Sequence, residues 1–228
     1  MVSVLITGAS DGIGRALVEC YRQKGATVIA HGRRPADRIT PRLPAQVTYV
    51  QSDLAQDVTP IADACPTQLD LAILNAGVGW VARPQDTPSD KIDDMIRINL
   101  TAQLELAHML YPKLVQGHGK LVFIGSTAAR GAQPEFSVYA ATKAALAGAA
   151  RSLRIEWDGK VDVQIIHPGP TATAMHDKAG LGDIAARRLF TAPHTVAQSI
   201  DTAIARGKPV ARFGPAFMLR HAILARFQ

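Results

Sequence analysis

Short apolar runs alternate along the chain with longer stretches whose apolar residues recur at helical spacing. A first βαβ unit is predicted from a strand at Val2–Ile6, a helix at Ile13–Lys24 and, after the turn at Gly25, a strand at Thr27–His31. Further strands are predicted at Val47–Val50, Leu69–Leu74, Lys120–Gly125 and Val161–Ile166, and further helices near 57–64, 89–116 and 137–157. This alternation predicts an α/β fold, with a parallel sheet covered by helices on both faces.

Length and composition fit one globular domain. The chain has 228 residues, of which 47% are hydrophobic and 19% charged, so it can bury a single core. Neither disorder nor a fibrous repeat fits this composition. We therefore assign residues 1–228 to one domain.

Charge and cysteine content argue against several kinds of partner. The formal net charge of +6 comes from scattered basic residues, without a zinc-finger or an aromatic-basic RNA-binding signature, so no nucleic-acid partner is expected. A solvated surface, or attraction of a phosphorylated ligand, explains the charge better. Cys20 and Cys65 stand far apart without metal-ligand spacing, and no metal site is predicted.

The first residues and the length of the apolar runs bear on location. The opening MVSVLITG lacks the basic start and the separate apolar run of a signal peptide. No stretch reaches the roughly 18 uninterrupted apolar residues of a membrane span. A cytoplasmic protein is the expectation.

A glycine-rich segment directly follows the first predicted strand. Thr7–Gly14 reads TGASDGIG, and the helix starts within it. Glycine allows positive φ and lets a diphosphate approach the N–H groups at the helix start, where the helix dipole favours an anion. A plain tight turn would also use glycine, but the position inside a βαβ unit favours a dinucleotide site formed by Gly8, Ser10, Asp11, Gly12, Ile13 and Gly14.

The end of the second strand indicates which dinucleotide is bound. His31–Arg34 contains no carboxylate to bind the ribose 2′-hydroxyl of NAD, whereas a guanidinium group suits the 2′-phosphate of NADP by charge and geometry. Arg33 and Arg34 therefore favour NADP(H) over NAD(H), with solvated loop arginines as the alternative. Asp11 places a negative charge nearby and weakens this inference.

Four polar residues form a candidate catalytic set. Tyr139 and Lys143 share one helix face, and a neighbouring ammonium favours the phenolate, although this spacing is also common on surface helices. Ser126 ends a strand, where its hydroxyl either orients a substrate oxygen or caps a helix. Asn99 lies between apolar neighbours, so it either holds backbone groups and water or is a structural core amide.

Together these residues resemble the short-chain dehydrogenase/reductase family over about residues 2–176. Thr7–Gly14 matches the family's TGxxxGxG loop, whose spacing differs from the TGxxGxxG of the related extended enzymes. The order and spacing of the family's catalytic tetrad recur in Asn99, Ser126, Tyr139 and Lys143. Further matches are the NAG motif at Asn75, Ala76 and Gly77, the adenine contact at Asp53 and Leu54, and the segment over the nicotinamide with Pro168, Gly169, Thr171 and Thr173.

The resemblance implies a Rossmann-type doubly wound sheet and an NADP(H)-dependent oxidoreductase. The substrate would be a small carbonyl or alcohol compound, and hydride would pass between its carbon and nicotinamide C4. Tyr139 would be the general acid/base, and Lys143 would lower its pKa and hold the nicotinamide ribose. Ser126 would polarise the substrate oxygen, and Asn99 would support a water that links Lys143 to solvent.

The C-terminal part departs from the family's commonest pattern. Residues 174–192 lie where the family builds its substrate lid, and their mixture of apolar and basic side chains does not identify the substrate. Where many tetrameric members have a final strand and an Asp-Gly-Gly stretch, this chain has Lys208–Gly214 and an apolar, basic tail at 215–228. We expect the tail to pack on its own core; closing over the substrate, a dimer contact and a membrane surface are the alternatives. A homodimer through the helices of 100–116 and 137–157 is expected rather than a tetramer.

A second class of function stays open, namely an NADP(H)-binding sensor without turnover. The complete set of Asn99, Ser126, Tyr139 and Lys143 argues against it, because a sensor has no need of all four. Oxidation of NADPH by reactive ketones would separate the two hypotheses.

Overall fold

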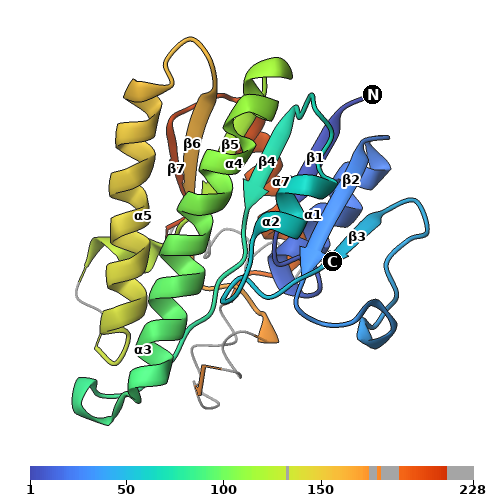
Figure 1. The fold of residues 1–228 in the computed structure, drawn as a ribbon. Coiled ribbons are helices and arrows are strands. Elements are labelled where there is room, and N and C mark those ends of the chain that lie inside the picture. The colour runs from blue at the N-terminus through green and yellow to red at the C-terminus, as the bar shows by residue number, and fades with distance from the viewer. Residues whose placement is uncertain (132–133, 175–178, 181–189, 215–228) are drawn as a thin grey trace, which may run out of the picture.

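A seven-stranded sheet forms the centre of the structure, a computed structural model that describes residues 1–131, 134–174, 179–180 and 190–214 (Figure 1). The strands are β1 (Ser3–Ile6), β2 (Thr27–Gly32), β3 (Thr48–Gln51), β4 (Leu71–Leu74), β5 (Lys120–Ile124), β6 (Asp162–His167) and β7 (Val210–Arg212). They are all parallel, in the order β3-β2-β1-β4-β5-β6-β7. The order reverses between β1 and β4, which is the place where sheets of this kind bind ligands.

Helices cover both faces of the sheet. They are α1 (Gly12–Gln23), α2 (Thr59–Ala64), α3 (Ser89–Ile96), α4 (Ala102–Gln116), α5 (Ser137–Glu156) and α7 (Pro193–Ala205). Shorter turns are η1 (Ala36–Arg38), η2 (Pro84–Asp86) and η4 (Thr127–Arg130), and the π-helical turn η3 (Arg97–Thr101) joins α3 to α4. The packing clusters place α2, α4 and α5 on one face and α1 and α7 on the other (Figure 1). The predicted doubly wound α/β fold is confirmed.

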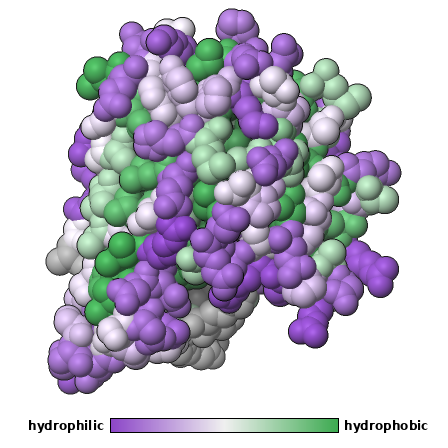
Figure 2. Space-filling view, viewed as in Figure 1, coloured by the Kyte–Doolittle hydropathy of each residue, from purple (hydrophilic) through white to green (hydrophobic). Residues whose placement is uncertain are grey.

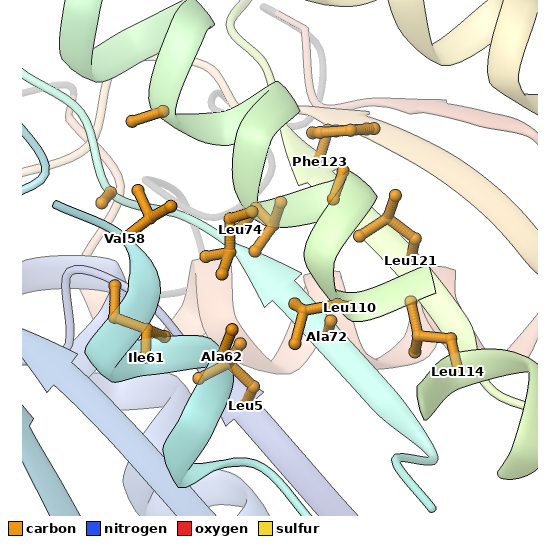
Figure 3. Packing of buried hydrophobic residues seen from close by; sticks show 14 of the residues in the cluster. Leu5, Val58, Ile61, Ala62, Ala72, Leu74, Leu110, Leu114, Leu121 and Phe123 are labelled. Carbon is orange, nitrogen blue, oxygen red and sulfur yellow. The ribbon is translucent and has the colours of Figure 1, made fainter. Parts of the chain in front are cut away.

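Each face of the sheet has its own apolar core. Because successive side chains of a strand point to opposite faces, Leu5 packs towards α2 and α4, whereas Val4 and Ile6 pack towards α1 and α7. Figure 3 shows the first of these cores, where Leu5, Ile61, Leu74, Leu110 and Phe123 meet. Burial of a side chain of this size contributes about 1.5–3 kcal/mol. The two cores fix the strand ends, from which the loops of the site emerge.

The strand and helix predictions agree with the structure to within about two residues at most ends, with three differences. The stretch 89–116 is interrupted by the π-helical turn, which apolar spacing does not reveal. Helix α7 was not predicted. Val210–Arg212 forms the edge strand β7, so the expectation that the chain lacks this final strand is wrong; three residues are too few to show a period.

Some sequence predictions lie outside the described residues. These are most of the expected lid at 174–192, namely 175–178 and 181–189, and the whole tail at 215–228. Across the described ranges, no helix combines the length and apolar character that crossing a membrane requires. The same ranges contain no group of three or more His, Cys, Asp or Glu side chains placed to hold a metal ion.

The outer surface of α4 and α5 mixes hydrophobic and hydrophilic residues (Figure 2). Met109 on α4 is 37% exposed, and Ile155 near the end of α5 is 80% exposed. Single exposed apolar residues are common on protein surfaces and do not by themselves indicate a contact. The homodimer through these helices stays a prediction.

Candidate active site

The predicted site residues lie at the carboxyl ends of six strands or on the helices that follow them. The loop after β1 carries Gly8, Ser10 and Asp11, and the first turn of α1 carries Gly12, Ile13 and Gly14. The loops after β2 and β3 carry Arg33, Arg34, Asp53 and Leu54. Asn75, Ala76 and Gly77 follow β4, Asn99 lies in η3, and Ser126 follows β5. Tyr139 and Lys143 are on α5, and Pro168, Gly169, Thr171 and Thr173 follow β6.

The loop between β1 and α1 requires glycine at two close contacts. Gly8 has φ +66°, and a Cβ there would lie 2.8 Å from the Ala76 Cα. A Cβ at Gly14 would lie 2.2 Å from the Gly8 carbonyl oxygen. Larger residues would push the loop away from β4 and α1 away from the loop, so glycine keeps the backbone of the three segments together.

The start of α1 fits a diphosphate group. The Asp11 Oδ1 accepts a hydrogen bond from the Gly12 N–H at 2.7 Å and caps the helix. The N–H groups of the first turn have no intrahelical acceptor, and the helix dipole gives this end partial positive charge. Thr173 closes the other side, since a Cβ at Gly12 would lie 2.8 Å from its Cγ2.

Thr7 and Asn75 join the glycine loop to the loop after β4. The Thr7 Oγ1 accepts hydrogen bonds from the N–H groups of Asn75 at 2.9 Å and Ala76 at 3.0 Å. In return, the Asn75 side chain donates to the Thr7 carbonyl at 3.0 Å. These bonds hold in register the two loops that border the switch point. The role of Thr7 in joining the two loops was not predicted from the sequence, where Thr7 was noted only as the first residue of the TGxxxGxG motif.

The two arginines after β2 have different surroundings. Arg34 donates to the Ser10 carbonyl at 3.0 Å and pairs with Asp11 at 3.3 Å, so it stabilises the glycine loop and offsets the Asp11 charge. The Arg33 side chain is 73% exposed, and its Nη1 lies 3.9 Å from the Asp53 Oδ2. Arg33 therefore keeps a guanidinium group that solvent and ligands can reach beside the loop.

Asn99 holds the backbone of the loop after β4. Its side chain accepts from the Val78 N–H at 2.8 Å and donates to the Val78 carbonyl at 2.9 Å. It also donates to the Thr142 Oγ1 at 3.2 Å, and Thr142 in turn donates to the Tyr139 carbonyl. The fully buried amide lies in the π-helical turn, a feature common at functional sites. Asn99 thus ties α5 to this loop.

Lys143 is a buried cation. Its side chain is on the inner face of α5, and the Nζ donates to the Ile124 carbonyl at 2.9 Å. Burial lowers the pKa of Lys143 to about 8. A Cβ at Gly77 would lie 3.4 Å from the Lys143 Nζ and 3.2 Å from the Asn99 Oδ1, so glycine leaves the space beside both groups open.

Tyr139 and Ser126 are hydrogen-bonded. Burial raises the pKa of Tyr139 above its usual value, and the hydrogen bond with Ser126 lowers it. The expected lowering of this pKa by Lys143 is not seen, because the Nζ bonds to Ile124 and lies 5.9 Å from the ring centroid of Tyr139. The Ser126 Oγ also accepts from the Ala128 N–H at 3.1 Å, so Ser126 caps η4 as well as contacting Tyr139.

His167, a buried residue in contact with Ser126, was not predicted from the sequence. His167 ends β6, and its Nδ1 lies 2.9 Å from the Ser126 carbonyl oxygen. A single polar residue at the end of an apolar run gives little signal in a sequence. Its place directly before Pro168 and Gly169 was the one available indication.

Known proteins resemble this chain over most of its length. A family model, described as short chain dehydrogenase, matches residues 3–184. The uncharacterized oxidoreductase YciK of Escherichia coli (strain K12) is 32% identical over 192 residues, which cover 77% of this chain and 76% of that protein. An NAD-dependent glycerol dehydrogenase of Listeria innocua is 27% identical over 189 residues, covering 79% and 74%.

A solved structure agrees with this assignment. The short-chain dehydrogenase from Sphingobium yanoikuyae in complex with NADPH superposes with a TM-score of 0.84 at 25% identity, and the match covers 100% of this chain and 93% of that one. The extent of the family match and the similarity of the folds agree with the order of the motifs. The chain belongs to the short-chain dehydrogenase/reductase family and is an NAD(P)-dependent oxidoreductase.

Proposed function

We propose that this protein is an NADP(H)-dependent ketone or aldehyde reductase, or the corresponding alcohol dehydrogenase, with Tyr139 as the general acid/base. The observation that carries the proposal is the buried Tyr139 phenol, hydrogen-bonded to Ser126 and one helical turn from the Lys143 ammonium. A phenol that loses its proton only with help from its neighbours suits a proton donor in carbonyl reduction.

The residues around the substrate oxygen divide the chemistry between them. When bound, the nicotinamide supplies the hydride that reduces the carbonyl carbon. Tyr139 donates its hydroxyl proton to the oxygen. The Ser126 Oγ accepts from the Ala128 N–H and has one proton to donate, which the Tyr139 oxygen receives in the free protein. With substrate bound, this proton would turn to the substrate oxygen and orient it. In alcohol oxidation the same proton returns to Tyr139.

Lys143 and Asn99 act on the far side of Tyr139. The Lys143 ammonium holds the nicotinamide ribose, and the open space at Gly77 lets a hydroxyl approach the Nζ. Asn99 keeps the loop after β4 and α5 in fixed relation through its bonds to Val78 and Thr142. A water beside Lys143 would complete a proton path to solvent.

The remaining predicted residues form the cofactor site. The glycine loop with Gly8, Ser10, Asp11, Gly12, Ile13 and Gly14 binds the diphosphate, and Asp53 and Leu54 contact the adenine. The loop with Asn75, Ala76 and Gly77 would hold the riboses. Pro168, Gly169, Thr171 and Thr173 would hold the nicotinamide.

Arg33 is the basis for the proposed NADP(H) preference. One structural neighbour is in complex with NADPH and one relative is NAD-dependent, so the cofactor preference is inferred from the residues of this chain. Replacement of the exposed Arg33 by alanine is expected to lower kcat/KM for NADPH about 10-fold, the size of a solvent-exposed charged hydrogen bond, and to leave NADH almost unaffected.

The ratio of kcat/KM for NADPH and NADH measures this effect. Arg38→Ala is the matched control, because Arg38 is an exposed arginine of the same connection and stands five positions further on. An NADH preference in the parent protein, or an unchanged ratio in Arg33→Ala, would remove Arg33 from the cofactor site.

Turnover separates the enzyme from a binding protein. We expect NADPH oxidation with at least one member of a panel of reactive ketones, aldehydes and quinones. NADPH binding without turnover across the whole panel would favour the sensor hypothesis instead.

A further inference from the structure

We propose that His167 is a positioning residue, which fixes the backbone of Ser126 so that the Ser126 hydroxyl reaches Tyr139 and the substrate oxygen. This inference rests on the proposed function, since it assigns His167 a part in the same reaction. His167 acts through Ser126 rather than on the substrate.

The sheet holds His167 in a defined place. In the β5–β6 pairing Ile124 lies opposite Ile166, so Gly125 comes opposite His167. The imidazole is only 3% exposed. A Cβ at Gly125 would lie 2.6 Å from the Nδ1, so the glycine provides the space in which the ring lies.

The His167 imidazole bonds to Ser126 at the point where the backbone hydrogen bonds between β5 and β6 end. The Gly125 N–H donates to the Ile166 carbonyl at 2.7 Å, and the Thr127 N–H donates to the Pro168 carbonyl at 3.1 Å. Pro168 has no N–H of its own to extend the ladder. The His167 Nδ1 lies 2.9 Å from the Ser126 carbonyl oxygen and 3.3 Å from the Ser126 nitrogen.

The charges around His167 favour the neutral ring. Burial lowers the pKa of His167, and so do the positive charges of Arg212 on β7, Lys143 on α5 and Arg130 in η4, whereas the hydrogen bond with the Ser126 backbone raises it. The Nδ1 can donate to the Ser126 carbonyl at 2.9 Å or accept from the Ser126 N–H at 3.3 Å, and the shorter contact favours the tautomer with the ring proton on Nδ1. A neutral donor bonds Ser126 without adding a further positive charge beside Lys143.

The geometry links His167 to the acid/base chemistry through one intermediate residue. With its carbonyl bonded to His167 and its Oγ bonded to the Ala128 N–H, Ser126 has little freedom to turn. Its hydroxyl then keeps the hydrogen bond that lowers the pKa of Tyr139. Loss of the imidazole would weaken this hydrogen bond and so raise the pKa of Tyr139. A purely structural residue would not have this effect.

The test compares His167→Leu with His167→Asn in the full-length protein. Leucine fills the space without a donor, whereas the asparagine Nδ2 stands one bond beyond Cγ, as the histidine Nδ1 does. We expect His167→Leu to lower kcat about 10-fold, as loss of one hydrogen bond allows, and to leave KM for NADPH unchanged. His167→Asn should recover most of the rate.

The pH profile supplies a second readout. Alcohol oxidation needs the Tyr139 phenolate, so its rate rises with pH through the pKa of Tyr139. In His167→Leu this rise should move to higher pH, and in His167→Asn it should return towards the parent position. In His167→Gln the side-chain amide stands one bond further from the backbone, near the place of Nε2, and cannot replace the Nδ1 bond. His167→Gln should therefore show the same lower kcat and shifted pH profile as His167→Leu. It supplies the test if His167→Leu does not fold.

The matched control is Gln164→Met. Gln164 lies in the same strand, is 2% exposed, and has no hydrogen-bond partner for either amide atom within the part of the chain described. Strand alternation turns it to the face opposite His167. This variant should keep the parent kcat and pH profile.

Each outcome decides between the two proposals. Parental kcat in His167→Leu and His167→Gln, or a His167→Asn variant as slow as His167→Leu, would overturn the inference. Tyr139→Phe is measured alongside: if it is inactive while His167→Leu is fully active, only the inference fails. If Tyr139→Phe is fully active, the proposed function fails first and the inference falls with it.

Discussion

Tyr139→Phe is expected to lower kcat for carbonyl reduction by about 10²–10⁴-fold, the range in which a positioned general acid contributes. The variant loses only the phenol oxygen. Its ring can keep the edge contact with Phe136, whose centroid lies 6.0 Å away, so folding and NADPH binding should persist. Initial rates with a good carbonyl substrate and a fluorescence titration with NADPH measure the two properties separately.

A second tyrosine provides the control for this variant. Tyr111 on α4 packs against Trp157, with ring centroids 4.7 Å apart and ring planes tilted by 41°. Tyr111→Phe should keep the parent kcat, because its hydroxyl has no place in the proposed reaction. Equal rates in Tyr139→Phe and the parent would show that another group supplies the proton.

Lys143→Met is expected to lower kcat by about 10²-fold, because it removes the ammonium group that holds the nicotinamide ribose in the proposed mechanism and begins the proton path to solvent. Lys113→Met is the matched control. Like Lys143, Lys113 donates to a backbone carbonyl, that of Cys65 at 2.6 Å, but it is only partly buried and lies on α4 away from the proposed site. A similar loss of kcat in both variants would mean that lysine removal acts through stability.

The same substitution has a predictable effect on stability. The pKa of Lys143 is about 8 in the folded protein, below its ordinary value of 10.5. Between these two pH values the unfolded chain binds more protons than the folded one, so the free energy of unfolding rises with pH through this window. Below pH 8 the full cost of burying the charge is present. Denaturant unfolding of the parent, relative to Lys143→Met, should therefore show increasing stability from about pH 8 to pH 10.5.

The order of the elements and the edge of the site are predictable from the sequence for a physical reason. In a doubly wound sheet the inner strands are buried on both faces, so they appear as short apolar runs such as Val4–Ile6. The carboxyl ends of parallel strands lie at one edge. The chemistry-bearing residues that follow each run, from the glycine loop to Ser126, therefore had to lie near one another.

The partners of these residues are not predictable in the same way. Arg33 and Arg34 are equivalent in the sequence, and only the fold shows that Arg34 bonds to Ser10 while Arg33 faces solvent. Helical spacing suggests that Lys143 lowers the pKa of Tyr139 directly. In the structure the Lys143 Nζ instead donates to the carbonyl of Ile124 in β5, 19 residues earlier in the chain. The contact of His167 with Ser126 joins residues 41 positions apart. Such contacts depend on strand order and register, which local patterns do not contain.

Transfer of deuterium from labelled cofactor is the most direct test of the central claim, that this chain moves a hydride from NADPH to a carbonyl carbon with Tyr139 as proton donor. The protein is incubated with NADPH deuterated at both C4 positions and with a panel of ketones and aldehydes, and the alcohols are analysed by mass spectrometry. We predict one deuterium on the carbinol carbon for at least one substrate, and almost none with Tyr139→Phe. Unlabelled alcohol, equal labelling by Tyr139→Phe, or bound cofactor without any product would contradict the claim.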